Sequence, residues 1–227
     1  MKTREFAIIV AGGKGTRIKS AVPKQFLELN GKPVLMHTIQ AFLDYASETG
    51  IVVVLPADDL KLWSDLCEQH HFRATIKVVT GGESRFQSVK NGLEHVPDDC
   101  LVAIHDGVRP LVSSDIIGAS YRLAAVHGSA VAAVRLKESI RMTDQDNTKA
   151  MDRSRFRLIQ TPQTFHAAVI KKAYLVKEQP SMTDDASVAE FSGHVISLFE
   201  GSYENLKITT PEDLVVAQAL FNSRRKT

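Results

Sequence analysis

Continuous apolar runs alternate along this chain with amphipathic stretches that have helical spacing. Such runs are buried on both faces, which is typical of strands in a parallel sheet covered by helices. They predict strands at residues 6–10, 51–55, 75–79, 101–104 and 130–134. The amphipathic stretches predict helices at residues 37–45, 59–70, 84–95 and 115–127. The pattern therefore predicts an α/β fold: a doubly wound, Rossmann-like, mostly parallel sheet with helices on both faces.

This alternation of apolar and amphipathic segments is interrupted between Leu136 and Gln160, where the chain is polar, charged and rich in turn residues. The segment predicts a protruding β-arm, a hairpin of about residues 136–160 that leaves the core. An exposed hairpin is only marginally stable by itself, so we hypothesise that the arm packs on a second subunit and is used in dimerisation. A flexible excursion is the alternative.

The regular pattern returns after the arm. Residues 161–163 lead into a helix predicted at about 166–177, and residues 183–185 can cap a helix that ends before Gly193. Residues 195–199 are predicted to rejoin the sheet. A short strand around Lys207 then precedes a last helix, with Thr210 as N-cap and Pro211 at the first helical position. Because no linker interrupts the pattern, we expect residues 1–227 to form a single domain.

Composition narrows the possible partners and compartment. The chain has 227 residues, of which 44% are hydrophobic, and a formal charge of +2 from 28 basic and 26 acidic residues. This balance argues against a dedicated nucleic-acid binder. We expect no membrane association and a cytoplasmic location, because no apolar stretch approaches the roughly 20 residues of a membrane span and the first residues lack a signal-peptide pattern. Cys67 and Cys100 are predicted to be free, buried thiols.

The sequence AGGKGTR at residues 11–17 directly follows the first strand, and Pro23-Lys24-Gln25 comes soon after it. Glycines let backbone N–H groups close around a phosphate, and Arg17 and Lys24 add full positive charge. The loop matches neither a Walker motif, since Gly15 follows Lys14, nor the dinucleotide fingerprint, since Ile18 stands at the last glycine position. We interpret it as a third kind of nucleotide loop; a strand-ending turn with solvated cations is the simpler alternative.

Two further segments are predicted at the carboxyl ends of strands, where doubly wound sheets bind ligands. They are residues 81–88, with Gly81-Gly82 before a helix that Ser84 caps, and residues 105–109, with Asp106. Taken alone, the glycine pair is an ordinary turn and Asp106 a helix cap. Their shared position with the first loop favours one common site.

The candidate chemistry follows from what is missing as well as what is present. The sequence has no GxSxG elbow and no HExxH or other metal-ligand spacing, and His70-His71 reads as a surface pair at a helix end. Glycine loops with scattered cations suit attack on phosphorus, in which a substrate oxygen is the nucleophile and the protein positions charge. A triphosphate brings Mg²⁺ with it, and Asp106 is the best nearby carboxylate for that ion.

Seven motifs that follow one another along the chain resemble those of a known enzyme family. The set comprises AGGKGTR, Pro23-Lys24-Gln25, GGESRFQSV at 81–89, HDGVRP at 105–110, Thr161-Pro162-Gln163, TDDAS at 183–187 and NLKIT at 205–209. With these motifs the chain resembles the 2-C-methyl-D-erythritol 4-phosphate cytidylyltransferases over nearly its whole length. The ordered set is highly specific to that family and its close relatives.

The resemblance implies transfer of CMP from CTP to methylerythritol 4-phosphate, with release of pyrophosphate, in non-mevalonate isoprenoid synthesis. It also implies Mg²⁺ and a homodimer with interlocked arms. Arg17 and Lys24 would stabilise the α-phosphorus and the departing pyrophosphate. By motif, the cytosine and ribose would be held by Ala11, Gly12, Gly13, Gly15, Gly82, Glu83 and Ser88. The ribose and phosphate would face Asp106 and Gly107, and the second substrate would contact Arg153, Thr161, Thr183 and Lys207.

Two departures from the family's pattern keep other functions open. Gly107-Val108 stands where two alanines are common, and Glu83 stands where aspartate is frequent. The alternatives are a ribitol 5-phosphate cytidylyltransferase, a guanylyl or uridylyl sugar nucleotidyltransferase, and a nucleotide-binding regulatory protein without turnover. Arg153 is one of several arginines on the arm. If the arm is exchanged, Arg153 would serve the partner subunit's site.

Overall fold

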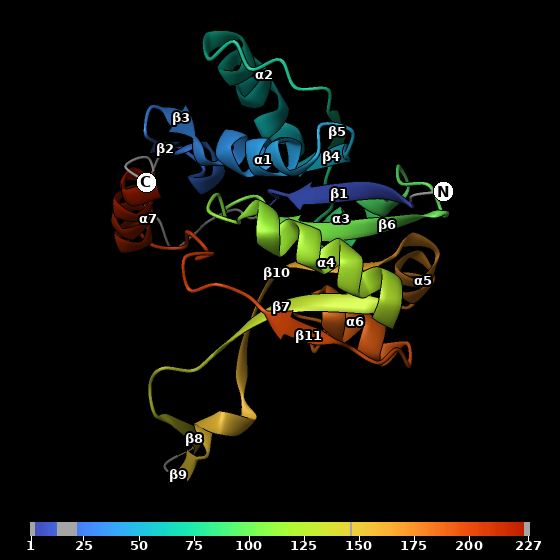
Figure 1. Ribbon diagram of the computed structural model, residues 1–227, viewed down its shortest axis with the longest axis vertical. Coiled ribbons are helices and arrows are strands. Elements are labelled where there is room, and N and C mark those ends of the chain that lie inside the picture. The colour runs from blue at the N-terminus through green and yellow to red at the C-terminus, as the bar shows by residue number, and fades with distance from the viewer. Residues whose placement is uncertain (1–2, 13–21, 146, 225–227) are drawn as a thin grey trace.

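One twisted sheet organises the part of the chain that the computed structural model describes, residues 3–12, 22–145 and 147–224. Its strand order is β11-β7-β10-β6-β1-β4-β5 (Figure 1). The strands are β1 (Arg4–Val10), β4 (Gly50–Leu55), β5 (Lys77–Thr80), β6 (Cys100–Asp106), β7 (Ser129–Arg135), β10 (Arg157–His166) and β11 (Leu198–Glu200). Only β10 runs antiparallel to its neighbours, β6 and β7. The predicted mostly parallel α/β sheet is therefore confirmed.

Helices cover both faces of this sheet. One face packs against α1 (Val34–Tyr45), α2 (Leu60–Gln69) and α4 (Ser114–His127). The other face packs against α3 (Arg85–Leu93), α5 (Ala167–Ala173) and α6 (Asp185–Phe191). The last helix, α7 (Pro211–Arg224), packs through Ala217 on Leu29 and Val34, beside the short pair β2 (Glu28–Leu29) and β3 (Lys32–Pro33). This is the doubly wound arrangement that the hydrophobic pattern predicts.

The central strands have apolar sequences because both their faces are buried. All seven residues of β6 are buried, and Ile8 and Ile9 of β1 have no exposed surface. Each fully buried aliphatic side chain of this kind contributes roughly 1.5–3 kcal/mol. Capping residues mark both ends of α4: the Ser113 side chain accepts a hydrogen bond from the Ile116 backbone at its start, and Gly128 ends the helix at φ 84°. Local signals and burial thus agree along the core.

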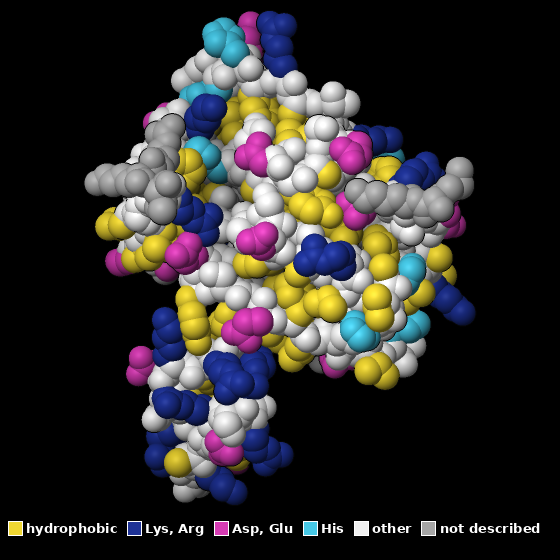
Figure 2. Space-filling view, in the orientation of Figure 1, with side chains coloured by type: hydrophobic (Ala, Val, Ile, Leu, Met, Phe, Trp, Pro, Cys, Tyr) yellow, Lys and Arg dark blue, Asp and Glu magenta, His cyan; other side chains and the backbone are white. Residues whose placement is uncertain are grey.

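An arm leaves the core between β7 and β10. Its tip is the hairpin of β8 (Ile140–Asp144) and β9 (Asn147–Met151), which lies apart from the sheet (Figure 1). Nearly all of its described side chains are exposed, and Lys and Arg side chains are prominent on it (Figure 2). The cations of the arm and its base include Lys137, Arg141, Lys149, Arg153, Arg155 and Arg157. The arm is a hydrophilic, positively charged projection.

Several boundaries differ from the sequence expectations in the C-terminal half. Residues 157–160 belong to the base of the arm and to β10, a strand that the sequence did not indicate. Its polar residues and Pro162 remove the apolar pattern that predicts a strand. A register shift between Ile159 and Gln163 accommodates the proline within the sheet. The helix expected at 166–177 is the shorter α5, and the strand at 195–199 is the shorter β11.

The expected strand around Lys207 is wrong. Residues 206–209 form no strand, and a backbone hydrogen bond of 2.9 Å joins Ile208 N to the Val108 carbonyl. The start of α7 is as expected, with Pro211 first and Thr210 Oγ1 accepting from Asp213 N at 3.4 Å. Cys100 is buried and Cys67 half-buried, both as free thiols. No described helix combines the length and apolarity that crossing a membrane requires.

Candidate active site

A cavity of about 730 Å³ opens at the carboxyl ends of β1, β4, β5 and β6. Backbone hydrogen bonds continue beyond the strands and hold their loops together. Ala11 N donates to the Val54 carbonyl at 2.9 Å, Gly81 N to Leu55 at 2.7 Å, and Gly107 N to Val10 at 2.8 Å. The three glycine-containing segments predicted at strand ends therefore meet at one edge of the sheet.

Most of the predicted site residues that are described line this cavity. They are Ala11, Gly12, Lys24, Gly82, Glu83, Ser88, Asp106 and Lys207. They come from segments distributed over nearly the whole chain, and the sheet brings them together. Gly13, Gly15 and Arg17 lie outside the described residues.

The remaining predicted residues lie elsewhere. Gly107 is buried behind the cavity, where an added Cβ would lie 2.9 Å from the Ala11 Cβ. Thr161 is also buried, and its Oγ1 accepts a 3.0 Å hydrogen bond from Asp106 N, so it supports the strand end that carries Asp106. Thr183 is exposed beside α6 and is not part of the cavity wall. Arg153 lies on the exposed arm, where its guanidinium donates to the Lys137 carbonyl.

The glycine loops are shaped by Ser88, the buried serine of α3. An added Cβ on Gly81 would lie 2.7 Å from Ser88 Oγ, and one on Gly12 would lie 3.2 Å from it. Ser88 Oγ also accepts a 3.2 Å hydrogen bond from Gly82 N. The missing side chains thus let two loops close over one helix, which leaves their backbone groups along the cavity wall.

Lys24 reaches the cavity from a short 3-10 turn, Lys24–Phe26. The next side chain, Gln25, is buried and also lines the cavity. Its amide donates a 2.9 Å hydrogen bond to Asp59 Oδ2. This contact attaches the turn that carries Lys24 to the segment after β4.

Asp106 ends β6 inside a cluster of cations. Its Oδ2 lies 3.1 Å from both Arg109 Nε and Lys207 Nζ, and its Oδ1 lies 3.9 Å from Arg85 Nε. Burial by itself would raise the pKa of Asp106, but the charges of Lys207, Arg85 and Arg109 outweigh it and hold the pKa well below its usual range. Asp106 is therefore a carboxylate throughout the physiological pH range.

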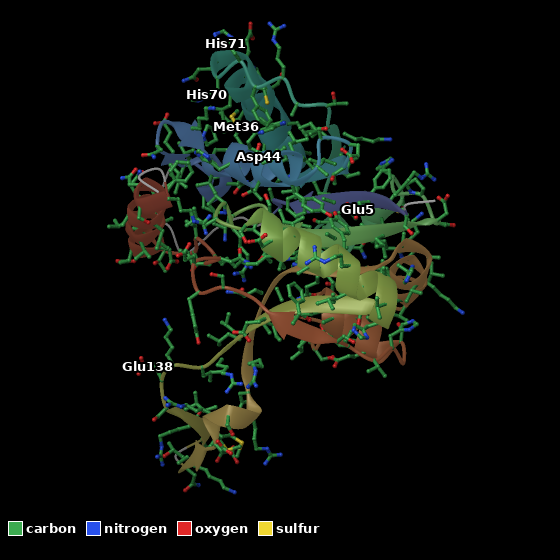
Figure 3. All side chains as sticks on the ribbon, in the orientation of Figure 1. Glu5, Met36, Asp44, His70, His71 and Glu138 are labelled. Carbon is green, nitrogen blue, oxygen red and sulfur yellow. The ribbon has the colours of Figure 1, made fainter. Side chains whose placement is uncertain are left out.

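The neighbouring His105 is fully buried, as expected for the end of a buried strand. Burial lowers its pKa to about 4, so the ring is neutral near pH 7. Its Nε2 lies 3.2 Å from the Arg109 carbonyl, and its ring packs edge-on against Phe42. His70 and His71 lie at the far end of α2 (Figure 3). Among the described residues, His105 is the histidine next to the Asp106 cluster, and its role there is to pack in the core.

Arg85 joins the Asp106 cluster to a second carboxylate. Its Nη1 and Nη2 donate to Asp185 at 3.0 and 2.6 Å, and the Tyr174 hydroxyl donates to Asp185 Oδ1 at 2.7 Å. Asp185 is completely buried. Burial by itself would lower the pKa of Arg85, but the charge of Asp185 raises it above its ordinary value, so the guanidinium is always charged.

Four residues of the site were not predicted from the sequence, although all lie within the motifs that carry the family resemblance: Arg85, Arg109, Asp185 and Asn205. Asn205 is completely buried, accepts a 2.8 Å hydrogen bond from Arg109 on its carbonyl, and donates one of the same length to the Thr161 carbonyl. These contacts hold the segment before Lys207 against β10. A charged residue inside a glycine motif, such as Arg85, was the available signal, but its partner is a hundred positions away.

The cavity offers a limited set of metal ligands. Among the described residues, no three His, Cys, Asp or Glu side chains gather into a metal-binding group. Asp106 is a permanently ionised carboxylate on the cavity wall. This fits Mg²⁺ that arrives with substrate phosphates, because that ion keeps several waters and takes only one or two protein carboxylates.

Sequence comparison agrees with the arrangement of the site. The model of the family described as 2-C-methyl-D-erythritol 4-phosphate cytidylyltransferase matches residues 6–223. A protein of that name from Bacteroides thetaiotaomicron is 46% identical over 218 residues, which cover 96% of this chain and all of the relative. Another of that name, from Porphyromonas gingivalis, is 46% identical over 224 residues and covers 98% of this chain and all of the relative.

Solved structures give the same result. A 4-diphosphocytidyl-2C-methyl-D-erythritol synthase from Anaerococcus prevotii superposes with a TM-score of 0.83 at 28% identity, over 97% of this chain and 96% of that one. The 2-C-methyl-D-erythritol 4-phosphate cytidylyltransferase of Francisella tularensis has a TM-score of 0.79 at 31% identity, over 96% and 99% of the two chains. The chain belongs to the 2-C-methyl-D-erythritol 4-phosphate cytidylyltransferase family of nucleotidyltransferases.

Proposed function

We propose that this protein transfers CMP from CTP to 2-C-methyl-D-erythritol 4-phosphate, giving 4-diphosphocytidyl-2-C-methyl-D-erythritol and pyrophosphate. The observation that carries this proposal is the convergence of two glycine loops with Lys24 and Lys207 around one cavity. The names of the relatives favour this reaction over the ribitol 5-phosphate alternative. The same names favour an enzyme over a nucleotide-binding protein without turnover.

The reaction requires no nucleophile from the protein. An oxygen of the methylerythritol phosphate attacks the α-phosphorus of CTP and forms a new P–O bond, while the bond from that phosphorus to its bridging oxygen breaks and pyrophosphate leaves. Negative charge accumulates on the phosphoryl oxygens and the leaving group, so preorganised cations provide the catalysis. We assign this stabilisation of negative charge to Lys24, which lines the cavity, and to Arg17, which lies outside the residues that the structure describes.

The glycine loops suit the nucleoside. The exocyclic amino group of cytosine donates hydrogen bonds, and backbone carbonyls in the loops of Gly12 and Gly82 are acceptors that a small, uncovered backbone can offer. Glu83 and Ser88 border the same part of the cavity. We propose that this end of the cavity selects CTP, with Asp106 facing the ribose and phosphates.

Mg²⁺ would accompany the triphosphate and neutralise charge on its phosphate oxygens. We propose Asp106 as the protein ligand of this ion.

Lys207 would contact the phosphate of the second substrate. The 3.1 Å ion pair between Lys207 and Asp106 holds the ammonium group at the cavity wall. Thr161 would support this pocket indirectly, because its hydroxyl accepts a hydrogen bond from the Asp106 backbone N–H. Thr183 remains a prediction for this pocket. We also propose a cytoplasmic location.

Arg153 supports a dimeric active site. It lies on an arm that projects away from the sheet (Figure 1), and it is not part of the cavity wall of its own chain. We propose a homodimer in which each arm brings Arg153 to the other subunit's cavity, where the guanidinium binds the second substrate's phosphate. Bidentate recognition of phosphate is a task for which arginine is well suited.

Mixed dimers test this arrangement. Arg153→Ala and Lys24→Ala are each expected to lower turnover by about a hundredfold, since each removes a charged donor. If Arg153 acts across the dimer, refolding the two variants together restores activity, because one site of each mixed dimer then has both residues. If Arg153 acts within its own chain, no mixed dimer has an intact site and the mixture stays inactive. Turnover is compared before and after subunit exchange.

The reaction itself is tested by pyrophosphate release with CTP and Mg²⁺. Methylerythritol 4-phosphate and ribitol 5-phosphate are offered in parallel, GTP and UTP replace CTP in further reactions, and Arg17→Ala is the control. We expect release only with CTP and methylerythritol phosphate, lost in the variant. Release with ribitol phosphate instead, or with no acceptor at all, would contradict the assignment.

A further inference from the structure

Arg85 lies between two carboxylates and forms hydrogen bonds with only one of them. Its two terminal nitrogens donate to Asp185 at 3.0 and 2.6 Å. Its Nε lies 3.9 Å from Asp106 Oδ1, which is too far for a hydrogen bond. A movement of about 1 Å would turn this long ion pair into a hydrogen-bonded one.

Asp185 holds the guanidinium in place. It is completely buried at the first position of α6, so its carboxylate cannot turn to solvent. The Tyr174 hydroxyl donates to the same carboxylate and restricts it further. A bidentate pair between a guanidinium and a carboxylate fixes both the distance and the plane of the guanidinium. The Arg85 side chain is 28% exposed and lines the cavity, so it is not enclosed on every side.

Asp106 uses its two oxygens differently. Oδ2 takes the direct contacts from Arg109 and Lys207, both at 3.1 Å. Oδ1 is the oxygen next to Arg85, and the residue lines the cavity. If the guanidinium left Asp185, the negative charge of Asp106 would attract it and Oδ1 would become occupied.

We propose that Asp185 is a positioning residue that holds Arg85 in a bidentate pair and so keeps Oδ1 of Asp106 open to the bound nucleotide. This rests on the proposed function, in which the cavity binds CTP. Asp185 is not among the described residues that line the cavity, and it acts on Asp106 through Arg85.

The test is the CTP dissociation constant of the full chain with Mg²⁺, measured by titration calorimetry. Asp185→Asn removes the charge that restrains Arg85, and CTP affinity is expected to fall on the order of tenfold, the effect of losing one hydrogen bond to a charged group. The double variant R85Q/D185N also removes the guanidinium that would occupy Asp106. It is expected to recover most of the lost affinity.

Recovery in the double variant distinguishes positioning from a structural role. If Asp185 only stabilised the fold, the double variant would bind CTP as weakly as Asp185→Asn, and that result would overturn the proposal. Unchanged affinity in Asp185→Asn would overturn it too. If Asp185→Asn does not fold, Arg85→Lys replaces it, because lysine cannot form the bidentate pair and its ammonium is free to approach Asp106. Arg85→Lys must then bind CTP more weakly than Arg85→Gln, which has no cation to place on Asp106 and keeps the Tyr174 hydrogen bond to Asp185. Equal affinity of these two variants would overturn the proposal.

Asp98→Asn is the matched control, since Asp98 is 73% exposed and pairs with Lys171 away from the cavity. It should bind CTP like the wild type. Thermal unfolding of every variant establishes the folded fraction used for each titration. Failure of the proposed function is seen separately, as wild-type protein that does not bind CTP or that binds it without turning over methylerythritol 4-phosphate.

Discussion

Replacing Lys24 by alanine is expected to lower kcat for CMP transfer by about 10²–10³-fold, the loss that follows removal of one preorganised donor from a developing negative charge. Lys24 stands on a turn that Gln25 attaches to Asp59, so its position is set before substrate arrives. The effect is expected mainly in kcat, because the phosphoryl charge that Lys24 meets is greatest in the transition state. Steady-state kinetics with both substrates varied measure it.

Lys32→Ala is the control for this change. Lys32 carries the same charge on β3, nearby in sequence, but it is exposed and does not line the cavity. It should leave kcat unchanged, and both variants should unfold at wild-type denaturant concentrations. A Lys24→Ala enzyme with wild-type kcat would remove Lys24 from the catalytic assignment.

Replacing Asp106 by asparagine is expected to reduce both activity and stability. The substitution preserves shape but leaves Arg109, Lys207 and Arg85 without the carboxylate that they share. Breaking a buried ionic cluster by neutralising one member typically costs about 3 kcal/mol of unfolding free energy. Turnover should fall by about a hundredfold or more, because Lys207 loses its anchor and the nucleotide loses a carboxylate contact.

Urea unfolding and pyrophosphate release measure the two effects separately. Asp99→Asn is the comparison, since Asp99 pairs with Arg4 on the surface and is 74% exposed. Exposed pairs contribute about 0–1 kcal/mol, so its stability should change little. If Asp106→Asn were as stable and as active as Asp99→Asn, the cation cluster would have no role in the site.

The two substitutions examine different features of one cavity. Lys24 comes from a loop close to the first strand and was selected from sequence by its neighbourhood to the glycine motif. Asp106 was selected as a strand-end carboxylate, without its partners. Its partners come from three places: Arg85 at the start of α3, Arg109 after β6, and Lys207 before α7.

The hydrophobic pattern determined the fold class because burial is a property of each strand by itself. The runs that became β1, β4, β6 and β7 are apolar on both faces, and this requires covered layers on each side of a sheet. Strand β10 escaped detection since it is polar and contains Pro162, and it is placed by pairing with β6 and β7. Pairing between distant strands leaves no local mark in a sequence.

The sequence by itself also determined where ligand chemistry would lie, because parallel strands bring the loops at their carboxyl ends to one edge. Only the tertiary structure decided which charges meet there. Arg85 and Asp185 pair across the molecule, and Asn205 holds the segment before Lys207 through Thr161 and Arg109. These contacts depend on distances between residues far apart in the chain, which periodicity and composition do not encode. The glycine loops can therefore be predicted from the sequence, whereas the ionic network beside them is set by the packing of distant segments.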